Sequence, residues 1–176
     1  VLFDDELAMA LGANIHGAVP DVFVNADGIK KSISAPGPGN YITLAKSAAS
    51  IRALCGEEAL KTQSFVQAHG SSTPQNRTTE SLIFDQVANA FGISDWPVTA
   101  VKAFVGHSLA PASADQMINT LGIFKDEVLP GIKTVESIAG DVYQDRLRLP
   151  TRDLALQERA EISFLNSKGF GGNNAT

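Results

Sequence analysis

The sequence predicts a layered α/β fold. Short apolar runs of strand length alternate along the 176 residues with longer segments whose apolar residues recur at helical spacing. Three of the short runs lead directly into turns of small and polar residues, where a strand ends and can direct side chains into a cleft. Hydrophobic residues make up 44% of the chain and charged residues 19%, a globular composition. The length suits one well-buried domain.

Four segments are predicted to be helices because apolar residues recur at every third or fourth position. Asp4 and Asp5 can cap the first, and glycines suit the ends of the first three. The fourth carries Met117, Ile118, Leu121 and Phe124 on one side. The predicted helices cover residues 4–12, 42–54, 79–91 and 112–124.

Four further segments are predicted to be strands. Residues 15–26 alternate loosely and are rich in valine, and the other three are short apolar runs that precede the polar turns. The strands cover residues 15–26, 64–67, 97–101 and 162–165. Two prolines and two glycines predict a loop over residues 34–40, and residues 128–150 show no regular pattern.

Composition excludes several classes of protein. The net charge is −5 with a pI near 5.1, and no Lys/Arg run could bind a nucleic-acid backbone. No apolar stretch approaches the roughly 20 residues that a membrane helix needs, and no secretory signal pattern is visible. The single cysteine, Cys55, cannot form an internal disulfide, so we expect a reducing, cytoplasmic setting.

The three polar turns read HGSSTP from His69, KAFVGHS from Lys102 and NSKGFGGNNA from Asn166. A lone histidine is more often structural than catalytic. The histidines form no HxxxH or HxH pair and no cysteine stands at ligand spacing, so no metal site is predicted. The glycine-rich turn lacks the lysine and the following helix of a phosphate-binding P-loop.

Taken together, these turns resemble those of the β-ketoacyl-acyl carrier protein synthases, which condense acyl chains in fatty acid and polyketide synthesis. In that family an HGT-type, a KxxxGHS/T-type and an NSFGFGG-type turn follow one another in the same order. The resemblance covers nearly all of residues 1–176 and implies the C-terminal half of a thiolase-like fold, a mixed sheet with helices on both faces. It also implies that the chain is a fragment of a longer enzyme.

The resemblance implies roles for four residues. His69 and His107 would donate hydrogen bonds to the thioester oxygen of the malonyl extender as it becomes an enolate. Lys102 would support the histidines; its simpler reading is a structural ion pair, and we expect a carboxylate or several acceptors near it because an unpartnered buried lysine is costly. Phe170 would gate the acyl pocket, and its backbone N–H would form half of the oxyanion hole.

Further residues match positions near the substrate in the family. Ser71 and Thr73 correspond to hydroxyls that bind the phosphopantetheine arm, although such residues also cap turns. Gly169 and Gly171 would let the last turn approach the thioester. Glu80 matches a glutamate near the site, and its alternative reading is an acid favoured at a helix N-terminus.

The chain also departs from the family pattern. Gln116 replaces the glutamate that partners the lysine, and Lys168 replaces an aromatic residue. Cys55 lies at a predicted helix end, not where the family has its nucleophile, and we interpret it as a small apolar filler. The remaining departures are Arg77, Ala110, Pro111, Ser113 and Asn173. Together with Gln116 they bear on the choice of substrate more than on the reaction type.

We therefore expect the C-terminal half of a condensing enzyme that performs decarboxylative Claisen condensation. The missing half would supply the cysteine nucleophile, acyl carrier protein would bring substrates on its phosphopantetheine, and no other cofactor is expected. Binding an acidic carrier needs a basic patch, to which Lys30 with Lys31, or Arg146 with Arg148, could contribute. The complete enzyme is expected to be a homodimer.

The alternative is a non-catalytic partner subunit that resembles a chain-length factor. Such subunits usually lose the nucleophile or the histidines, and both histidines are present here. A thiolase or a starter-type synthase fits less well, because neither has the histidine of the GHS turn in this arrangement.

Overall fold

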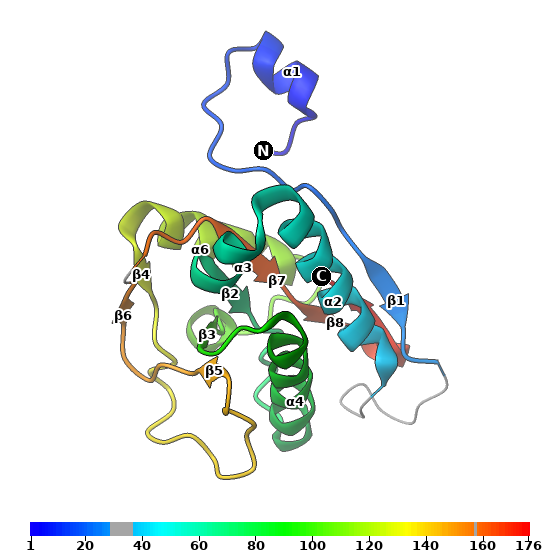
Figure 1. Cartoon of the computed structure of the whole chain (residues 1–176), viewed down its shortest axis with the longest axis vertical. Coiled ribbons are helices and arrows are strands. Elements are labelled where there is room, and N and C mark those ends of the chain that lie inside the picture. Colours follow the sequence, from blue (N-terminus) through cyan, green and yellow to red (C-terminus); the bar gives the residue numbers. More distant parts are fainter. Residues whose placement is uncertain (29–36, 157) are drawn as a thin grey trace.

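A four-stranded parallel sheet forms the centre of the protein (Figure 1). The computed structural model describes residues 1–28, 37–156 and 158–176. The strand order is β5-β3-β2-β7, and each neighbouring pair is parallel. The strands are β2 (Ser64–Gln67), β3 (Trp96–Thr99), β5 (Leu147–Arg148) and β7 (Ile162–Leu165). Parallel strands require crossover segments, which here contain the helices.

A second, antiparallel sheet continues from the end of β7. Its order is β1-β9-β8, with β1 (Val24–Ala26), β8 (Ser167–Lys168) and β9 (Asn173–Ala175). Only Asn166 separates β7 from β8, so the parallel and antiparallel strands meet at this residue. A two-stranded ribbon pairs β4 (Val128–Leu129) with β6 (Leu154–Ala155).

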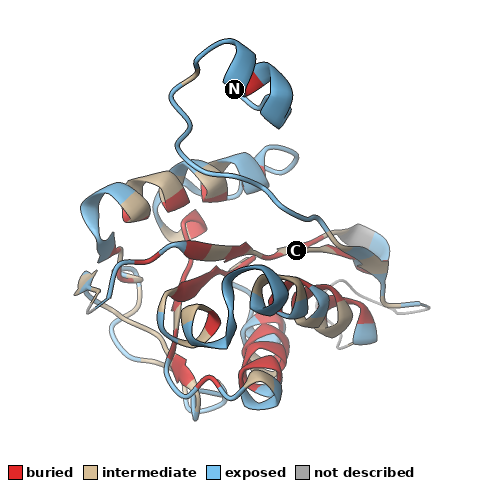
Figure 2. Cartoon of the chain, turned by 45° about the horizontal axis from the view of Figure 1, so that its top comes forward, coloured by how far each residue is buried: buried red, intermediate tan, exposed pale blue. Residues whose placement is uncertain are grey.

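Helices cover both faces of the parallel sheet (Figure 2). Successive residues of β2 point to opposite faces, and they enter different cores. Val66 packs in a cluster with residues of the helices α2 (Pro38–Cys55), α3 (Glu57–Thr62) and α4 (Pro74–Phe91). Phe65 packs in a second cluster with Ile123 of helix α6 (Ala112–Asp126). The helices are α1 (Asp5–Ala10), α2 (Pro38–Cys55), α3 (Glu57–Thr62), α4 (Pro74–Phe91), α5 (Lys102–Val105) and α6 (Ala112–Asp126), with the 3-10 turn η1 (Phe170–Gly172). The predicted α/β class is confirmed.

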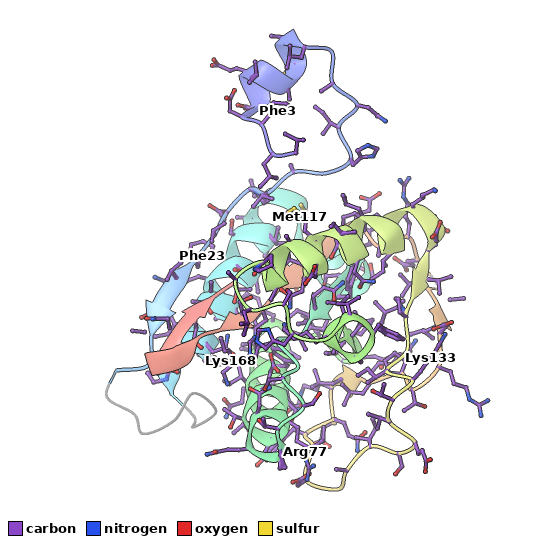
Figure 3. The ribbon with its side chains drawn as sticks, turned by 180° about the vertical axis from the view of Figure 1, so that it is seen from behind. Phe3, Phe23, Arg77, Met117, Lys133 and Lys168 are labelled. Atoms are coloured by element: carbon purple, nitrogen blue, oxygen red, sulfur yellow. The ribbon has the colours of Figure 1, made fainter. Side chains whose placement is uncertain are left out.

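The first helix lies apart from this body (Figures 1 and 3). Asp4 caps α1 as predicted, since its side chain accepts a hydrogen bond from the backbone N–H of Leu7. Residues 11–23 connect α1 to the second sheet without regular structure. Phe3, labelled in Figure 3, is half exposed beside α1.

Several predicted boundaries were wrong. Only residues 24–26 of the predicted strand 15–26 form a strand, because their partner β9 is three residues long. Of the predicted loop 34–40, residues 34–36 lie outside the described part of the chain, and α2 already begins at Pro38. A proline suits that position because the first turn of a helix leaves its N–H groups unpaired. The predicted strand 97–101 ends at Thr99, and the irregular segment 128–150 contains β4 and β5.

The apolar side predicted for the fourth helix is not its buried side. The residues of α6 that are buried are Ala112, Gln116, Thr120 and Ile123. Ile118 is 70% exposed, and Met117, Leu121 and Phe124 are half-buried. The helix therefore directs two polar side chains at the sheet and leaves part of its apolar side to solvent.

Candidate functional site

The three polar turns converge at one edge of the parallel sheet. His69 follows β2, Lys102 follows β3, and Asn166 follows β7. Because neighbouring parallel strands end at the same edge, residues far apart in the sequence meet there. The rings of His69 and His107 lie edge to face, with centroids 5.3 Å apart and planes at 81°. The predicted meeting of the two histidines is confirmed.

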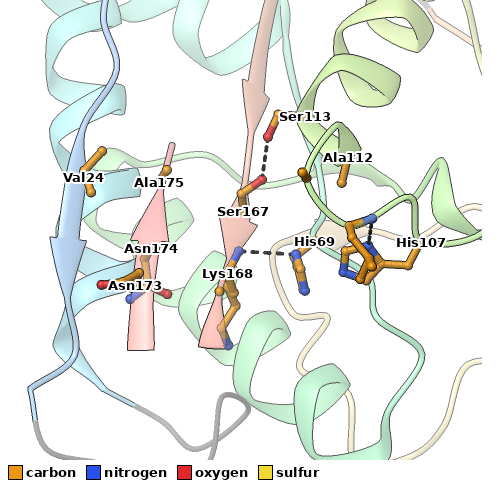
Figure 4. A pocket seen from close by; sticks show the side chains of 13 residues that line it. Val24, His69, His107, Ala112, Ser113, Ser167, Lys168, Asn173, Asn174 and Ala175 are labelled. Atoms are coloured by element: carbon orange, nitrogen blue, oxygen red, sulfur yellow. Dashed lines mark hydrogen bonds between the residues drawn. The ribbon is translucent and has the colours of Figure 1, made fainter. Parts of the chain in front are cut away.

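A cavity of about 240 Å³ opens beside the histidines (Figure 4). Its walls come from the two histidine turns, the start of α6 and the antiparallel sheet. Ser113 of α6 and Ser167 of β8 hydrogen-bond across one wall, with their Oγ atoms 2.9 Å apart. The lining includes His69, His107, Ala110, Ser113, Lys168, Gly169 and Asn173.

His69 is buried and is held as a neutral ring. Desolvation by burial lowers the pKa of His69 to about 4; Glu80 opposes this shift, and the charges of Lys102, His107 and Lys168 add to it. The Nδ1 atom of His69 accepts the backbone N–H of Lys168 at 3.3 Å. A neutral imidazole whose Nδ1 is an acceptor carries its proton on Nε2.

His107 has the same arrangement in an exposed position. Its Nδ1 accepts the backbone N–H of Leu109 at 3.1 Å, so a neutral ring again carries the proton on Nε2. Leu109 has a φ of 66°, in the left-handed region that a leucine rarely occupies. Strain of this kind concentrates at functional sites, and here it accompanies the contact that orients the ring.

Glu80 fixes the turn that carries His69. One carboxylate oxygen accepts the backbone N–H of His69 at 2.7 Å, and the other accepts the N–H of Gly70 at 3.0 Å. The side-chain amides of Asn76 and Asn166 donate to the same carboxylate at 2.9 and 2.7 Å. Glu80 therefore lies in the second turn of α4 as a buried acceptor, and these four hydrogen bonds explain its position better than the helix dipole does.

Asn166 links this carboxylate to the rest of the fold. Its side chain lies against Asn40 of α2, whose Nδ2 donates to the Asn166 Oδ1 at 2.5 Å. The hydroxyl of Thr176 donates to the same oxygen at 3.2 Å. Two helices and two strand ends are thereby joined through one amide side chain.

Gln116 does not partner Lys102. Its Nε2 donates to three backbone carbonyls instead, those of Gln67, Ala68 and Asn166. The Nζ of Lys102 is buried without a hydrogen-bond partner among the described residues, so the carboxylates of Glu80 and Asp115 act on it through charge alone. Desolvation lowers the pKa of Lys102, and the more distant charges of Glu80 and Asp115 oppose that shift.

Lys168 is buried between β8 and α4 (Figure 3). Its Nζ donates to the Oδ1 of Asn76 at 3.3 Å, and Asn76 in turn donates to Glu80. The lysine that replaces an aromatic residue therefore adds a positive charge to the same network as Glu80.

The backbone of the first turn requires glycine. Gly70 has a φ of 53°, and a Cβ there would lie 2.8 Å from the Cβ of Ala100. Ser72, two residues later, also has a positive φ of 61°. Gly169 lines the cavity, and its N–H donates to the carbonyl of Asn173 at 2.7 Å.

Other predicted site residues lie outside the cavity lining. Thr73 caps α4, where its hydroxyl accepts the N–H of Asn76, and Ser71 is half-buried beside it. Gly171 is exposed within η1. Phe170 begins η1, but its side chain lies outside what the structure describes, so its gating role stays a prediction.

Cys55 and Arg77 both lie on the surface. Cys55 is exposed at the end of α2, so it is not a core filler. Arg77 forms a bidentate ion pair with Asp141 on the surface and does not enter the cavity.

Residues 1–28, 37–156 and 158–176 contain no cluster of three or more His, Cys, Asp or Glu side chains arranged for a metal ion. Within the same ranges no helix is long and apolar enough to cross a membrane.

Sequence reasoning missed the polar network behind the histidines. Asn40, Asn76 and Asn166 are buried, although asparagine is usually exposed. Of these three asparagines, only Asn166 had a position in the sequence that indicated a role, because it directly follows a predicted strand. Asn40 contacts a residue 126 positions away, and no local pattern predicts such a contact.

Comparison with known proteins identifies the family. Residues 16–136 match the family described as "Beta-ketoacyl synthase, C-terminal domain". The chain belongs to this family. The predicted resemblance is thereby confirmed, and the family's fold agrees with the architecture described above.

The relatives are condensing enzymes considerably longer than this chain. Beta-ketoacyl-[acyl-carrier-protein] synthase FabY of Pseudomonas aeruginosa is 64% identical over 176 residues, which is 100% of this chain and 28% of the relative. 3-Oxoacyl-[acyl-carrier-protein] synthase 2 of Synechocystis is 27% identical over 180 residues, covering 100% of this chain and 40% of the relative. The chain therefore spans less than half of either protein.

Solved structures agree with the fold. The crystal structure of the noncanonical ketosynthase FabY from P. aeruginosa superposes with a TM-score of 0.93 at 64% identity, over 97% of this chain and 27% of that one. The ishigamide ketosynthase/chain length factor superposes with a TM-score of 0.72 at 27% identity, over 97% of this chain and 39% of that one.

Proposed function

We propose that this chain provides the enolate-stabilising half of a β-ketoacyl-acyl carrier protein synthase. The observation that supports this most strongly is the pair of histidines, 5.3 Å apart, each with an Nδ1 that accepts a backbone N–H. Both Nε2–H groups are then left to donate beside the cavity. Two N–H donors directed at one oxygen suit a reaction in which that oxygen gains negative charge.

The proposed reaction uses this charge in its decarboxylation step. The bond between the malonyl α-carbon and its carboxylate breaks, CO₂ leaves, and the electron pair forms the enolate of the thioester. Hydrogen bonds from His69 and His107 to the enolate oxygen lower the barrier, typically by about 3–4 kcal/mol per donor. The enolate carbon then attacks the acyl thioester on the enzyme, and the cysteine thiolate departs as the new carbon–carbon bond forms.

Burial keeps His69 suited to this role. A protonated ring would also donate, but its Nδ1 proton would face the N–H of Lys168. The lowered pKa of about 4 maintains the neutral form through the physiological range. Lys102, buried within the same region, adds positive potential that opposes protonation of His69 and favours the enolate.

The nucleophilic cysteine is assigned to a part of the protein outside this chain. Cys55 is exposed at the end of α2, whereas the cavity lining contains no cysteine. The N-terminal half of the same enzyme would pack on α6 and present the thiol to the cavity. Ile118 of α6 and Leu109 beside His107 are about 70% exposed and would be covered by it.

Acyl carrier protein is the proposed substrate carrier, and its phosphopantetheine thioester needs no additional cofactor. Ser71 and Thr73 would bind that arm where it crosses the first turn, and Gly169, Gly171 and the backbone of Phe170 would face the thioester. A basic patch at Arg146 and Arg148 is weakened, since these residues pair with Asp85 and Asp95. Lys30 and Lys31 lie outside the described residues. A homodimer is proposed for the complete enzyme.

A chain-length-factor role is less favoured. Such a subunit has no need for two histidines with matched Nδ1 acceptors, and both are present here. The assignment is tested in the full-length protein, supplied with an acyl thioester and malonyl-acyl carrier protein. We expect CO₂ release and a 3-ketoacyl product, each reduced by ~100-fold or more in His69→Ala and in His107→Ala. Full decarboxylation in both variants would contradict the proposed roles.

A further inference from the structure

The side chain of Gln116 joins two turns of the site from behind. Its Nε2 lies 2.9 Å from the carbonyl oxygen of Ala68, 3.1 Å from that of Asn166 and 3.2 Å from that of Gln67. The residue is fully buried. Gln67 ends β2 and Ala68 directly precedes His69, whereas Asn166 follows β7 directly before Ser167 and Lys168.

The contact requires a donor. Three backbone carbonyl oxygens converge on the amide nitrogen, and each would otherwise be a buried acceptor with one partner fewer. A primary amide supplies two N–H groups that the three oxygens share. An ionised carboxylate of the same size would place a negative oxygen among the three carbonyls, and an apolar side chain would donate nothing.

Glu80 complements Gln116 at the same turns. Gln116 donates to the carbonyls of Gln67 and Ala68, whereas Glu80 accepts the N–H groups of His69 and Gly70. Both also bind Asn166, Gln116 at its backbone oxygen and Glu80 at its side-chain nitrogen. Donor and acceptor therefore hold four consecutive residues of the first turn and the junction between β7 and β8.

We propose that Gln116 is a positioning residue for the histidine pair. By fixing the end of β2 against the end of β7, its amide keeps the N–H of Lys168 on the Nδ1 of His69 and keeps His69 opposite His107. It acts through the backbone and does not contact the substrate. This inference rests on the proposed function, because the positioned group is the enolate donor.

The test compares two substitutions in the full-length protein. Gln116→Met keeps the length and volume of the side chain but removes the donor. Gln116→Glu restores a donor only when the carboxyl is protonated, and burial among carbonyls raises the pKa of a carboxyl introduced there. Asn119→Leu on the same helix is the matched control, since Asn119 contacts the side chain of Gln67, not its backbone.

We expect Gln116→Met to lower kcat for condensation by ~10–100-fold with little change in KM, because small misplacements of a catalytic group reduce rates by about 100-fold. Relative to wild type, Gln116→Glu should gain at least ~5-fold in kcat as the pH falls from 8 to 6, whereas Gln116→Met should stay flat. Because both variants keep the charged and titratable groups around the turns, their comparison isolates the introduced carboxyl. These groups are His69, Glu80, Lys102, His107, Asp115 and Lys168.

A second readout does not depend on activity. Hydrogen exchange of the backbone amides in residues 67–70 and 166–169 should accelerate in Gln116→Met and stay unchanged in Asn119→Leu. If the wild-type enzyme performed no condensation, the proposed function would fail, and exchange would still decide whether Gln116 fixes the turns.

Two results would overturn the inference: unchanged kcat and exchange in Gln116→Met, or parallel pH profiles for the two Gln116 variants. If Gln116→Met did not fold, the pH profile of Gln116→Glu against wild type would decide, and a flat profile would reject the donor requirement. If neither variant folded at pH 6 or pH 8, Gln116 would be a folding determinant and the positioning role would be rejected.

Discussion

Replacing Glu80 with glutamine tests whether the buried carboxylate organises the site. The substitution keeps the shape of the side chain but changes one of its two oxygens into an NH₂ group. In the wild-type protein, each oxygen of Glu80 accepts one backbone N–H and one asparagine N–H. In either orientation of the new amide, its NH₂ group therefore faces two N–H donors that have lost their acceptor. Neither asparagine can turn its amide without breaking another contact, with Lys168 in one case and with Asn40 and Thr176 in the other.

The expected loss of stability and activity in Glu80→Gln follows from these contacts. A buried backbone N–H without an acceptor destabilises a protein by about 1–3 kcal/mol. The remaining hydrogen bonds also weaken, since bonds to an ionised acceptor are roughly twice as strong as neutral ones. We therefore expect Glu80→Gln to lower the free energy of unfolding by about 2–4 kcal/mol and to reduce condensation by at least ~10-fold through displacement of His69.

Asp85→Asn is the matched control for this variant. Asp85 is a second buried acid of α4, and it accepts the backbone N–H and the Nη1 of Arg146, away from the histidines. Urea unfolding and kcat would be measured for both variants in the full-length protein. Asp85→Asn should lose stability but keep kcat within about twofold. Equal losses of kcat in the two variants, or none in Glu80→Gln, would refute the role assigned to Glu80.

Three further predictions concern acidity, the cysteine and the isolated chain. The pKa of His69 is lowered from 6.5 to about 4, so the unfolded state takes up the proton first, and the native state loses stability as the pH falls from 6.5 toward 4. The expected loss at pH 5 is about 2 kcal/mol, and His69→Gln should remove it from the difference between urea titrations at pH 8 and pH 5. Cys55→Ser should leave condensation unchanged, since an exposed helix-end thiol is not the proposed nucleophile, and loss of acyl transfer would disprove that assignment. Residues 1–176 alone should show no covalent acylation by an acyl thioester, and a stoichiometric adduct in the intact mass would contradict the proposed division of labour.

The parts of the fold that local sequence determines were predictable. The strand at residues 64–67 and the end of α4 at Gly92, which adopts the left-handed conformation, were predicted correctly. The helix begins at Pro74, five residues before its predicted start. The strand predicted at 15–26 failed because strand formation also requires a partner. Val24, Asn25 and Ala26 pair with β9, and residues 15–23 are not part of any strand.

The candidate site also has features that the sequence could predict and features that it could not. The meeting of His69 and His107 could be inferred because the segments that carry them follow the neighbouring parallel strands β2 and β3, and such strands end at one edge. The hydrogen bonds of Glu80 could not be inferred, because its partner Asn166 lies 86 residues away. Gln116 replaces the glutamate that partners the lysine in the family, and it binds backbone carbonyls, since an amide can donate where a carboxylate cannot.

The orientation of α6 explains why its pattern was misleading. Amphipathic patterns assume that the apolar side faces the core of the same chain, yet α6 directs Gln116 and Thr120 at the sheet because strand-end carbonyls and the hydroxyl of Ser163 need polar partners there. The opposite side, including Ile118, borders a groove of about 520 Å³ with Phe104 and Val105 of α5. In the proposed enzyme that apolar surface is buried against the half that carries the nucleophile. The same helix therefore satisfies the backbone behind His69 on one side and receives the missing half on the other.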